Sequence, residues 1–192
     1  MVRAIVIPHD AGLPLRVQEL PGIGAFQEAV DGWIEAVDIP QFGVTIYVNE
    51  EGLVWRMPFN SRASFLWWHH EPRSRRSMLV GDAILVGLRD DVNDYSDVPS
   101  TVLDLLTTIQ PFAVMFASSK PLDLTTEARI SQVMLPLAAG DTRWLVSGAQ
   151  YEDYFTAAAW AVVLANIWSD AGEIRIVPVQ QLPQFLGQAF PT

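Results

Sequence analysis

Three neighbouring side chains, His69, His70 and Glu71, form the densest group in the sequence that could bind a metal ion, and His9 with Asp10 could add ligands. Imidazole nitrogens and carboxylate oxygens bind zinc or manganese, so this group makes a metal-dependent hydrolase one alternative function. Adjacent histidines point in different directions on a helix or strand, so a chelating pair does not follow from their spacing. We interpret the group as a solvated helix end.

A second group combines basic side chains with aromatic rings. It consists of Arg56, Arg62, Arg73, Arg75 and Arg76 with Trp55, Trp67 and Trp68. Single-stranded nucleic acid binds surfaces that pair positive charge with stacking rings. The face from Arg56 to Arg76 therefore gives a second alternative, a nucleic-acid-associated regulator. The same arginines could instead pair with the acidic second half of the chain.

Two further features indicate contacts with another protein. Residues 90–104 carry carboxylates and no base, namely Asp90, Asp91, Asp94, Asp97 and Asp104. They could mimic spaced phosphates and occupy the nucleic-acid site of another protein, or form an ordinary solvated loop. An exposed pair of Trp67 and Trp68 would anchor a protein partner, because aromatic rings bury much area at low entropic cost.

The familiar catalytic and cofactor motifs are absent from the sequence. Gly22 and Gly24 form a helix-start turn that lacks the third glycine of a dinucleotide site and the Gly-Lys-Ser/Thr of a P-loop. There is no Gly-x-Ser-x-Gly motif, and Ser147 has no evident paired base. The absence of cysteine excludes disulfides, thiolate nucleophiles and zinc sites that need sulfur. We expect no cofactor, and a binding protein more than an enzyme.

The composition is typical of an ordered globular protein. Of 192 residues, 50% are hydrophobic and 18% are charged, and the net charge is −10. Residues 1–89 hold eight bases and ten acids (−2), and residues 90–192 hold four and twelve (−8). This charge disfavours nucleic acid and anionic membranes, because its field repels phosphate. The apolar stretches fall short of the ~20 residues that span a bilayer and no signal peptide is evident, so we expect a cytoplasmic protein without a membrane segment.

The residue patterning predicts an α+β fold with mainly antiparallel sheets. We expect β-rich runs at residues 3–7, 15–20, 44–48, 53–56, 83–88, 112–117, 143–146 and 174–179, and helices at 25–31, 61–70, 100–108 and 152–168. The turn from Asn49 to Gly52 predicts that 44–48 and 53–56 pair as a hairpin. The helix near 152–168 is apolar on nearly every side and should be central, whereas residues 124–137 are ambiguous. The acidic segment 90–99 would be a linker or loop between units at 1–89 and 100–192.

Within the first half, short motifs follow one another in a characteristic order. They are Phe26-Gln27-Glu28-Ala29-Val30-Asp31-Gly32, Trp33-Ile34-Glu35-Ala36-Val37, Val48-Asn49-Glu50-Glu51-Gly52, Asn60-Ser61-Arg62-Ala63 and Gly81-Asp82-Ala83-Ile84-Leu85-Val86-Gly87. In this order they resemble a small uncharacterised domain family of bacterial, phage and plasmid proteins. The resemblance covers residues 1–89 and implies a fold unit without catalytic residues to carry over. The chain departs from the family pattern at residues 67–76.

Together these features lead us to expect a non-enzymatic accessory protein of a mobile genetic element. It would bind a host protein or a protein encoded by the element, through the Trp67 and Trp68 surface or through the acidic second half. The acidic residues would make it an inhibitor of a host factor. The nucleic-acid regulator and the metal-dependent hydrolase stay as alternatives, and the sequence leaves the oligomeric state open.

Overall fold

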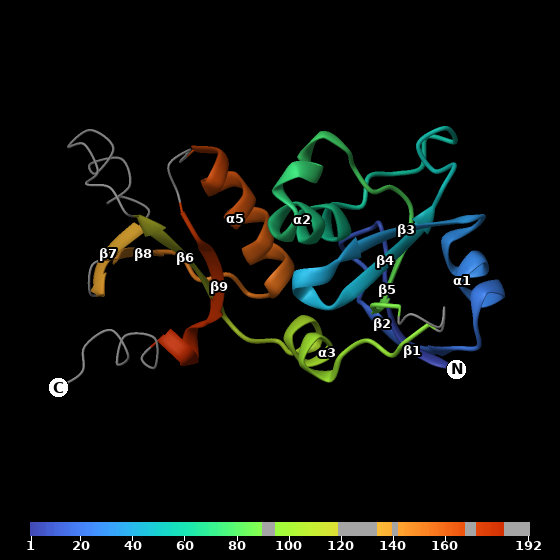
Figure 1. The fold of residues 1–192 in the computed structure, drawn as a ribbon, viewed down its shortest axis with the longest axis horizontal. Helices are drawn as coiled ribbons and strands as arrows, with labels where there is room; N and C mark the ends of the chain where they lie inside the picture. The colour runs from blue at the N-terminus through green and yellow to red at the C-terminus, as the bar shows by residue number, and fades with distance from the viewer. Residues whose placement is uncertain (90–94, 119–133, 140–141, 168–171, 183–192) are drawn as a thin grey trace. The chain divides into compact units, whose positions relative to one another are not determined.

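The computed structural model describes residues 1–89, 95–118, 134–139, 142–167 and 172–182 (Figure 1). The chain forms two compact units, Met1–Thr107 and Thr108–Thr192. Each unit contains one antiparallel sheet accompanied by helices, which confirms the predicted α+β class. The division follows Thr107, later in the chain than the boundary expected at 90–99, of which residues 90–94 lie outside the described part.

A five-stranded sheet in the order β2-β1-β5-β4-β3 forms the first unit. Its strands are β1 (Val2–Ile7), β2 (Arg16–Leu20), β3 (Ile34–Ile39), β4 (Val44–Asn49) and β5 (Ala83–Gly87), and neighbouring strands are antiparallel. β1 and β2 form the expected hairpin, in which Ile5 lies opposite Val17. Every residue of β4 and β5 is buried, as expected for central strands that read as nearly continuous apolar runs.

Helix α1 (Ile23–Val30) covers one face of this sheet. Its Phe26 and Val30 pack into a cluster of buried residues from four strands, namely Val2, Ala4, Val6, Leu20, Tyr47, Ile84 and Val86. The helix begins after Gly22, two residues before the expected start at 25, so Gly24 lies within the helix, which ends at Asp31, whose φ of 59° is left-handed. The chain therefore turns sharply between α1 and β3.

The predicted hairpin between residues 44–48 and 53–56 is wrong. β4 pairs instead with β3 on one side, where Ile39 lies opposite Val44, and with β5 on the other. Because both edges of β4 are occupied, residues 53–56 have no edge to join. They form consecutive turns outside the sheet. The link from β3 to β4 is a short 3₁₀ helix, η1 (Pro40–Phe42), which ends at Gly43 with a φ of 71°.

The helices α2 (Ser61–His70) and α3 (Ser100–Thr107) confirm the helices expected at 61–70 and 100–108. Asn60 caps α2, since its Oδ1 accepts a hydrogen bond from the Ala63 N–H at 3.0 Å. Its Nδ2 donates to the carbonyls of Ile7 and Gly81, both at 2.9 Å. Asn60 is fully buried, so these bonds tie the helix to the end of β1 and to the turn before β5. A 3₁₀ helix, η2 (Pro72–Arg76), follows α2.

The second unit contains a four-stranded sheet in the order β7-β8-β6-β9. Its elements are β6 (Phe112–Ser118), β7 (Met134–Ala139), β8 (Thr142–Ser147), α5 (Tyr154–Ile167), β9 (Ile174–Pro178) and η3 (Val179–Gln181). α5 packs on β6 and β9 and buries Ala157, Ala158 and Ala161 completely, which confirms the expected helix, while its Trp160, Val163 and Ile167 are exposed. Of the ambiguous residues 124–137, those from 134 onward form a strand and the others lie outside the described residues. No helix in the described ranges has the length and apolarity needed to cross a membrane.

Candidate functional site

The histidines singled out in the sequence pack at the end of α2. The rings of His69 and His70 meet edge to face at 4.8 Å, and His70 stacks on Phe42 at 4.3 Å. Burial lowers the pKa of His69 to about 3, with the charges of His70 and Arg75 adding to the shift, and burial lowers the pKa of His70 to about 4. Both imidazoles are therefore neutral near pH 7. Within the described ranges no three His, Asp or Glu side chains, Glu71 included, converge as metal ligands.

Trp67 and Trp68 are half-buried on α2. The Trp68 indole N–H donates to the Ser77 carbonyl at 2.8 Å, and its ring stacks on Phe59 and meets Phe65 edge to face. Trp68 thus already uses its N–H and its ring inside the unit, to hold the segment after η2 against α2.

The five arginines of the basic segment differ in their availability. Arg62 donates to the carbonyls of Pro8 and Asp10 at 3.0 and 3.1 Å. Arg75 donates to the Trp68 carbonyl at 3.4 Å, and burial lowers its pKa. Arg56, Arg73 and Arg76 are exposed. The structure thus leaves three of the five as open surface cations.

Part of the acidic segment has a structural contact. Asp97 accepts a hydrogen bond from the backbone N–H of Arg3 at 2.8 Å, and the neighbouring Val98 N–H donates to the Arg3 carbonyl at 2.9 Å. Asp104 lies exposed on α3. Asp90, Asp91 and Asp94 lie outside the described residues. Asp97 therefore helps to hold the segment before α3 along β1.

A histidine–carboxylate pair that the sequence analysis missed joins β1 to the start of β5. His9 Nδ1 lies 2.8 Å from Asp82 Oδ1, which also accepts from the His9 N–H at 3.0 Å, and Arg16 lies 3.6 Å from Oδ2. The pair borders a cavity of about 320 Å³ with Asp31 and Met57. None of the residues that line this cavity has a hydroxyl, thiol or amine side chain, so a nucleophile there would have to be one of its carboxylates or the His9 imidazole. Asp10, which the sequence grouped with His9, instead accepts from the Gly12 N–H.

The most exposed aromatic side chains of the first unit border a second cavity. Trp33 is 66% exposed and Trp55 is 56% exposed. Together with Gln27, Gly32 and Glu51 they line a groove of about 390 Å³, called here the tryptophan groove. Leu53 and Val54, in the same turn as Trp55, are also exposed. Exposed apolar residues that gather in one place, unlike single ones, typically mark a contact surface.

A buried asparagine holds the two sides of the tryptophan groove together. Asn49 Nδ2 donates to the carbonyls of Val30 and Asp31 at 3.3 and 2.6 Å, and its Oδ1 accepts from the Glu51 N–H at 2.8 Å. The Glu50 N–H donates to the Trp33 carbonyl at 2.9 Å. Three of these hydrogen bonds join the residues at and just after the end of α1 to the turn after β4, and the fourth, between Glu51 and Asn49, lies within that turn.

Two glycines allow this close approach. Gly32 has a φ of 154°, and a Cβ at this position would collide with the Asn49 amide. At Gly52 a Cβ would lie 2.8 Å from Val80 Cγ2. The turn itself is closed by the Trp55 N–H donating to the Glu51 carbonyl and the Met57 N–H donating to the Gly52 carbonyl, both at 2.9 Å. The backbone of the turn is therefore fixed while its apolar side chains face solvent.

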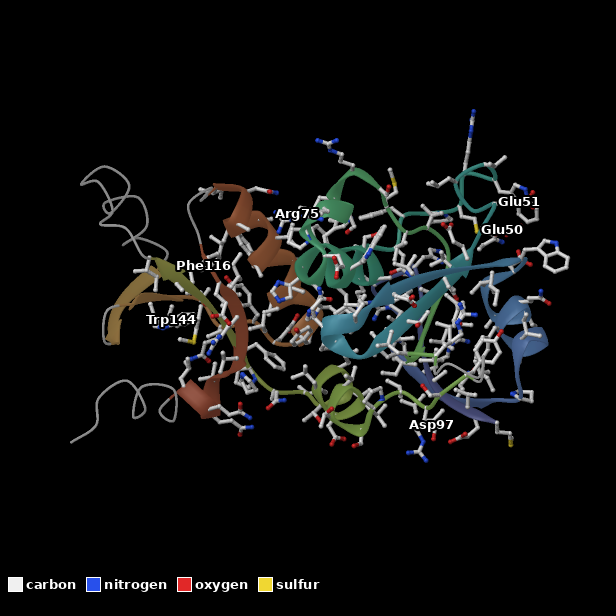
Figure 2. All side chains as sticks on the ribbon, viewed as in Figure 1. Glu50, Glu51, Arg75, Asp97, Phe116 and Trp144 are labelled. Atoms are coloured by element: carbon white, nitrogen blue, oxygen red, sulfur yellow. The ribbon has the colours of Figure 1, made fainter. Side chains whose placement is uncertain are left out.

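The surroundings of the tryptophan groove are acidic. Residues 27–35 and 49–56, which contain all its lining residues, carry five acids and one base: Glu28, Asp31, Glu35, Glu50, Glu51 and Arg56. Figure 2 shows Glu50 and Glu51 together on the turn after β4, apart from Asp97 and Arg75. The groove thus combines two exposed indole rings with negative charge.

The fold and this site define an α+β domain with an exposed aromatic groove, and no group of three His, Asp or Glu side chains among its described residues could hold a metal ion. Residues 2–110 match the model of the domain of unknown function DUF3846, and the chain belongs to that family. The match covers the first unit except Met1 and reaches further along the chain than the resemblance over residues 1–89. Comparison with curated proteins and with solved structures gives no significant match.

Proposed function

We propose that this chain is a non-enzymatic accessory protein that binds another protein, and that the tryptophan groove of its DUF3846 domain is the contact surface. The observation that carries the proposal is the exposure of Trp33 and Trp55 on a backbone frame fixed by Asn49. A tryptophan that serves only the fold is normally largely buried. Trp33 and Trp55 are attached to a fixed backbone, yet their side chains stay exposed.

The apolar area at this surface would supply part of the binding energy of a specific contact. Two tryptophans that expose more than half of their surface leave roughly 250 Å² to be covered, which corresponds to about 6 kcal/mol at ~25 cal/mol per Å² before the entropic costs of association. Tryptophan is also enriched among the residues that dominate binding energies. Exposed Leu53 and Val54 extend the area around Trp55.

We favour the tryptophan groove over the predicted surface at Trp67 and Trp68 as the contact surface, because the Trp68 indole donates a hydrogen bond to Ser77 and stacks on Phe59. The partner is proposed to be a host protein or a protein encoded by a mobile genetic element, as the resemblance of the first half to phage and plasmid proteins suggests. An inhibitory role of the acidic segment 90–97 belongs to the same proposal.

Photocrosslinking in the native host tests the contact surface. A benzoylphenylalanine at position 54 places the reactive group beside the groove while both tryptophans stay intact, since Val54 is 78% exposed. The same residue at Ile109, which is 93% exposed in the second unit, is the control. We expect a discrete protein adduct from position 54, absent from position 109 and lost when Trp33→Ala and Trp55→Ala are added.

Two outcomes would reject the proposed surface. One is that positions 54 and 109 give the same adducts. The other is that the adduct from position 54 is sensitive to nuclease and not to protease, which would favour the nucleic-acid regulator instead. Melting temperatures of the variants, measured alongside, show that loss of the adduct does not come from unfolding.

A further inference from the structure

The tryptophan groove has the chemical features of a receptor for a cation. Trp33 and Trp55 line a shared space, and Glu51 lies on its wall. A cation over an indole face is attracted by the quadrupole of the ring, and tryptophan is the strongest of the aromatic residues in this respect. A carboxylate at the same site adds an ion pair, so both kinds of group favour the same occupant.

Charge complementarity excludes most other occupants. The two segments that form the groove carry five acids against Arg56, and the chain as a whole carries −10. Such a field repels phosphates and acidic peptides and attracts basic ones. Glu51 and Gln27 also give the groove a polar side, and a purely apolar anchor against that side would leave those groups desolvated without partners.

The described residues that line the groove include no base. Arg56 follows Trp55 directly, yet it is not among the residues that line the groove. Its backbone is left-handed, with a φ of 55°. The second unit shows the geometry that an arginine would adopt: the guanidinium carbon of Arg175 lies 4.9 Å from the centroid of the Trp144 ring. A planar guanidinium can stack on an indole in this way and still bind a carboxylate.

Resting on the proposed function, we infer that the groove receives an arginine side chain from a basic segment of the partner protein. The guanidinium stacks against Trp33 or Trp55 and pairs with Glu51. Recognition of this kind selects the partner by a single buried cation, while the exposed Leu53 and Val54 add contact area that is less selective.

Indole N–H signals in NMR spectra of the full-length protein test this directly. The signals of Trp33 and Trp55 are assigned with Trp33→Phe and Trp55→Phe. The probe is the capped pentapeptide Gly-Arg-Gly-Arg-Gly, and its control replaces arginine with citrulline, which has nearly the same shape and no charge. We expect both signals to shift with the arginine peptide, and binding to weaken at least about fivefold with citrulline. Glu51→Gln should weaken the arginine peptide by about threefold or more and leave the citrulline peptide unchanged.

Equal binding of the two peptides, or shifts confined to the other tryptophans, would overturn the inference. Selection of random displayed peptides on wild type and on the Trp33→Ala, Trp55→Ala variant separates this failure from failure of the proposed function. If the selected peptides need the tryptophans for binding but lack basic residues, the proposed contact surface stands and the inferred arginine is wrong. Absence of any tryptophan-dependent peptide would count against both, and enrichment of arginine would support both.

Discussion

Asn60 offers the sharpest test of how the first unit is held together. It is fully buried, its Nδ2 donates to the carbonyls of Ile7 and Gly81, and its Oδ1 accepts from the Ala63 N–H. One side chain therefore connects three segments that are far apart in sequence. Asn60→Ala removes all three hydrogen bonds, whereas Asn60→Ser keeps a hydroxyl oxygen that can still cap α2.

The expected loss in the free energy of unfolding is the sum of the contributions of the helix cap and of the two buried carbonyls. Loss of a helix N-cap costs about 1 kcal/mol, and each buried carbonyl left without its donor adds on the order of 1 kcal/mol. Asn60→Ala should therefore lower the free energy of unfolding by roughly 3 kcal/mol, and Asn60→Ser by about 1 kcal/mol less. Since domains are stable by only about 5–15 kcal/mol, the alanine variant loses a large share of its stability.

Urea unfolding followed by hydrogen exchange and mass spectrometry measures the two units separately. At roughly 2 kcal/mol per molar urea, the midpoint of the first unit should fall by about 1.5 M for Asn60→Ala and by about 1 M for Asn60→Ser. The midpoint of residues 108–192 is the internal reference. A midpoint for Asn60→Ala equal to that of wild type, or no difference between alanine and serine, would refute the reasoning.

Three further predictions concern a cap, a glycine and the half-buried histidines His69 and His70. Asp153 accepts a hydrogen bond from the Thr156 N–H at 2.8 Å at the start of α5. Asp153→Ala should therefore lower the free energy of unfolding of the second unit, measured by urea, by about 1 kcal/mol, and Asp153→Asn should not. Gly32→Ala should displace Asn49 and lower both the melting temperature and crosslinking from position 54, whereas Gly24→Ala, with no atom within 4 Å of its Cβ, should leave both largely unchanged. Because burial holds the pKa values of His69 and His70 near 3 and 4, the unfolded chain binds more protons between pH 6.5 and pH 4. Stability should therefore fall as pH falls through that range, and His69→Gln with His70→Gln should reduce the slope seen in urea midpoints measured at pH 7 and pH 4.5.

The local elements of the fold could be predicted from sequence because short-range patterns determine them. The alternation at residues 15–20 and the β-branched run at 3–7 predict a hairpin, and Asn60 before an aromatic segment is typical of a helix start. The helix at 152–168 was recognisable from its uninterrupted apolar middle, and Asp153 at its start is a typical cap.

The strand pairing of residues 44–48 could not be predicted in the same way. The Asn49 to Gly52 turn is real, since the Gly52 N–H donates to the Asn49 carbonyl at 3.1 Å. The predicted hairpin does not form because β5, which begins more than 30 residues after the end of β4, occupies the edge of β4 with which residues 53–56 would have paired. Competition for a strand edge is a property of the whole sheet and leaves no trace in a local window.

The candidate sites could not be predicted from the sequence for a related reason. His9 and Asp82 lie 73 positions apart and meet only because β1 pairs with β5. The exposure of Trp33 and Trp55 likewise depends on where α1 ends and on which strands flank β4. One signal was nevertheless available: Leu53, Val54 and Trp55 follow a turn directly, and apolar residues there have either a strand partner or a binding partner.

The tryptophan groove separates the residues that build it from the residues that would bind. Asn49, Gly32 and Gly52 fix its backbone through hydrogen bonds and close packing, and none of them presents a large apolar surface. Trp33, Val54 and Trp55 contribute their side chains mainly to the exposed surface. Since exposing indole rings in water opposes solubility without adding to the core, a turn that needed only to close the chain could use polar residues instead. We therefore assign Asn49, Gly32 and Gly52 to folding and propose that the indole rings serve recognition.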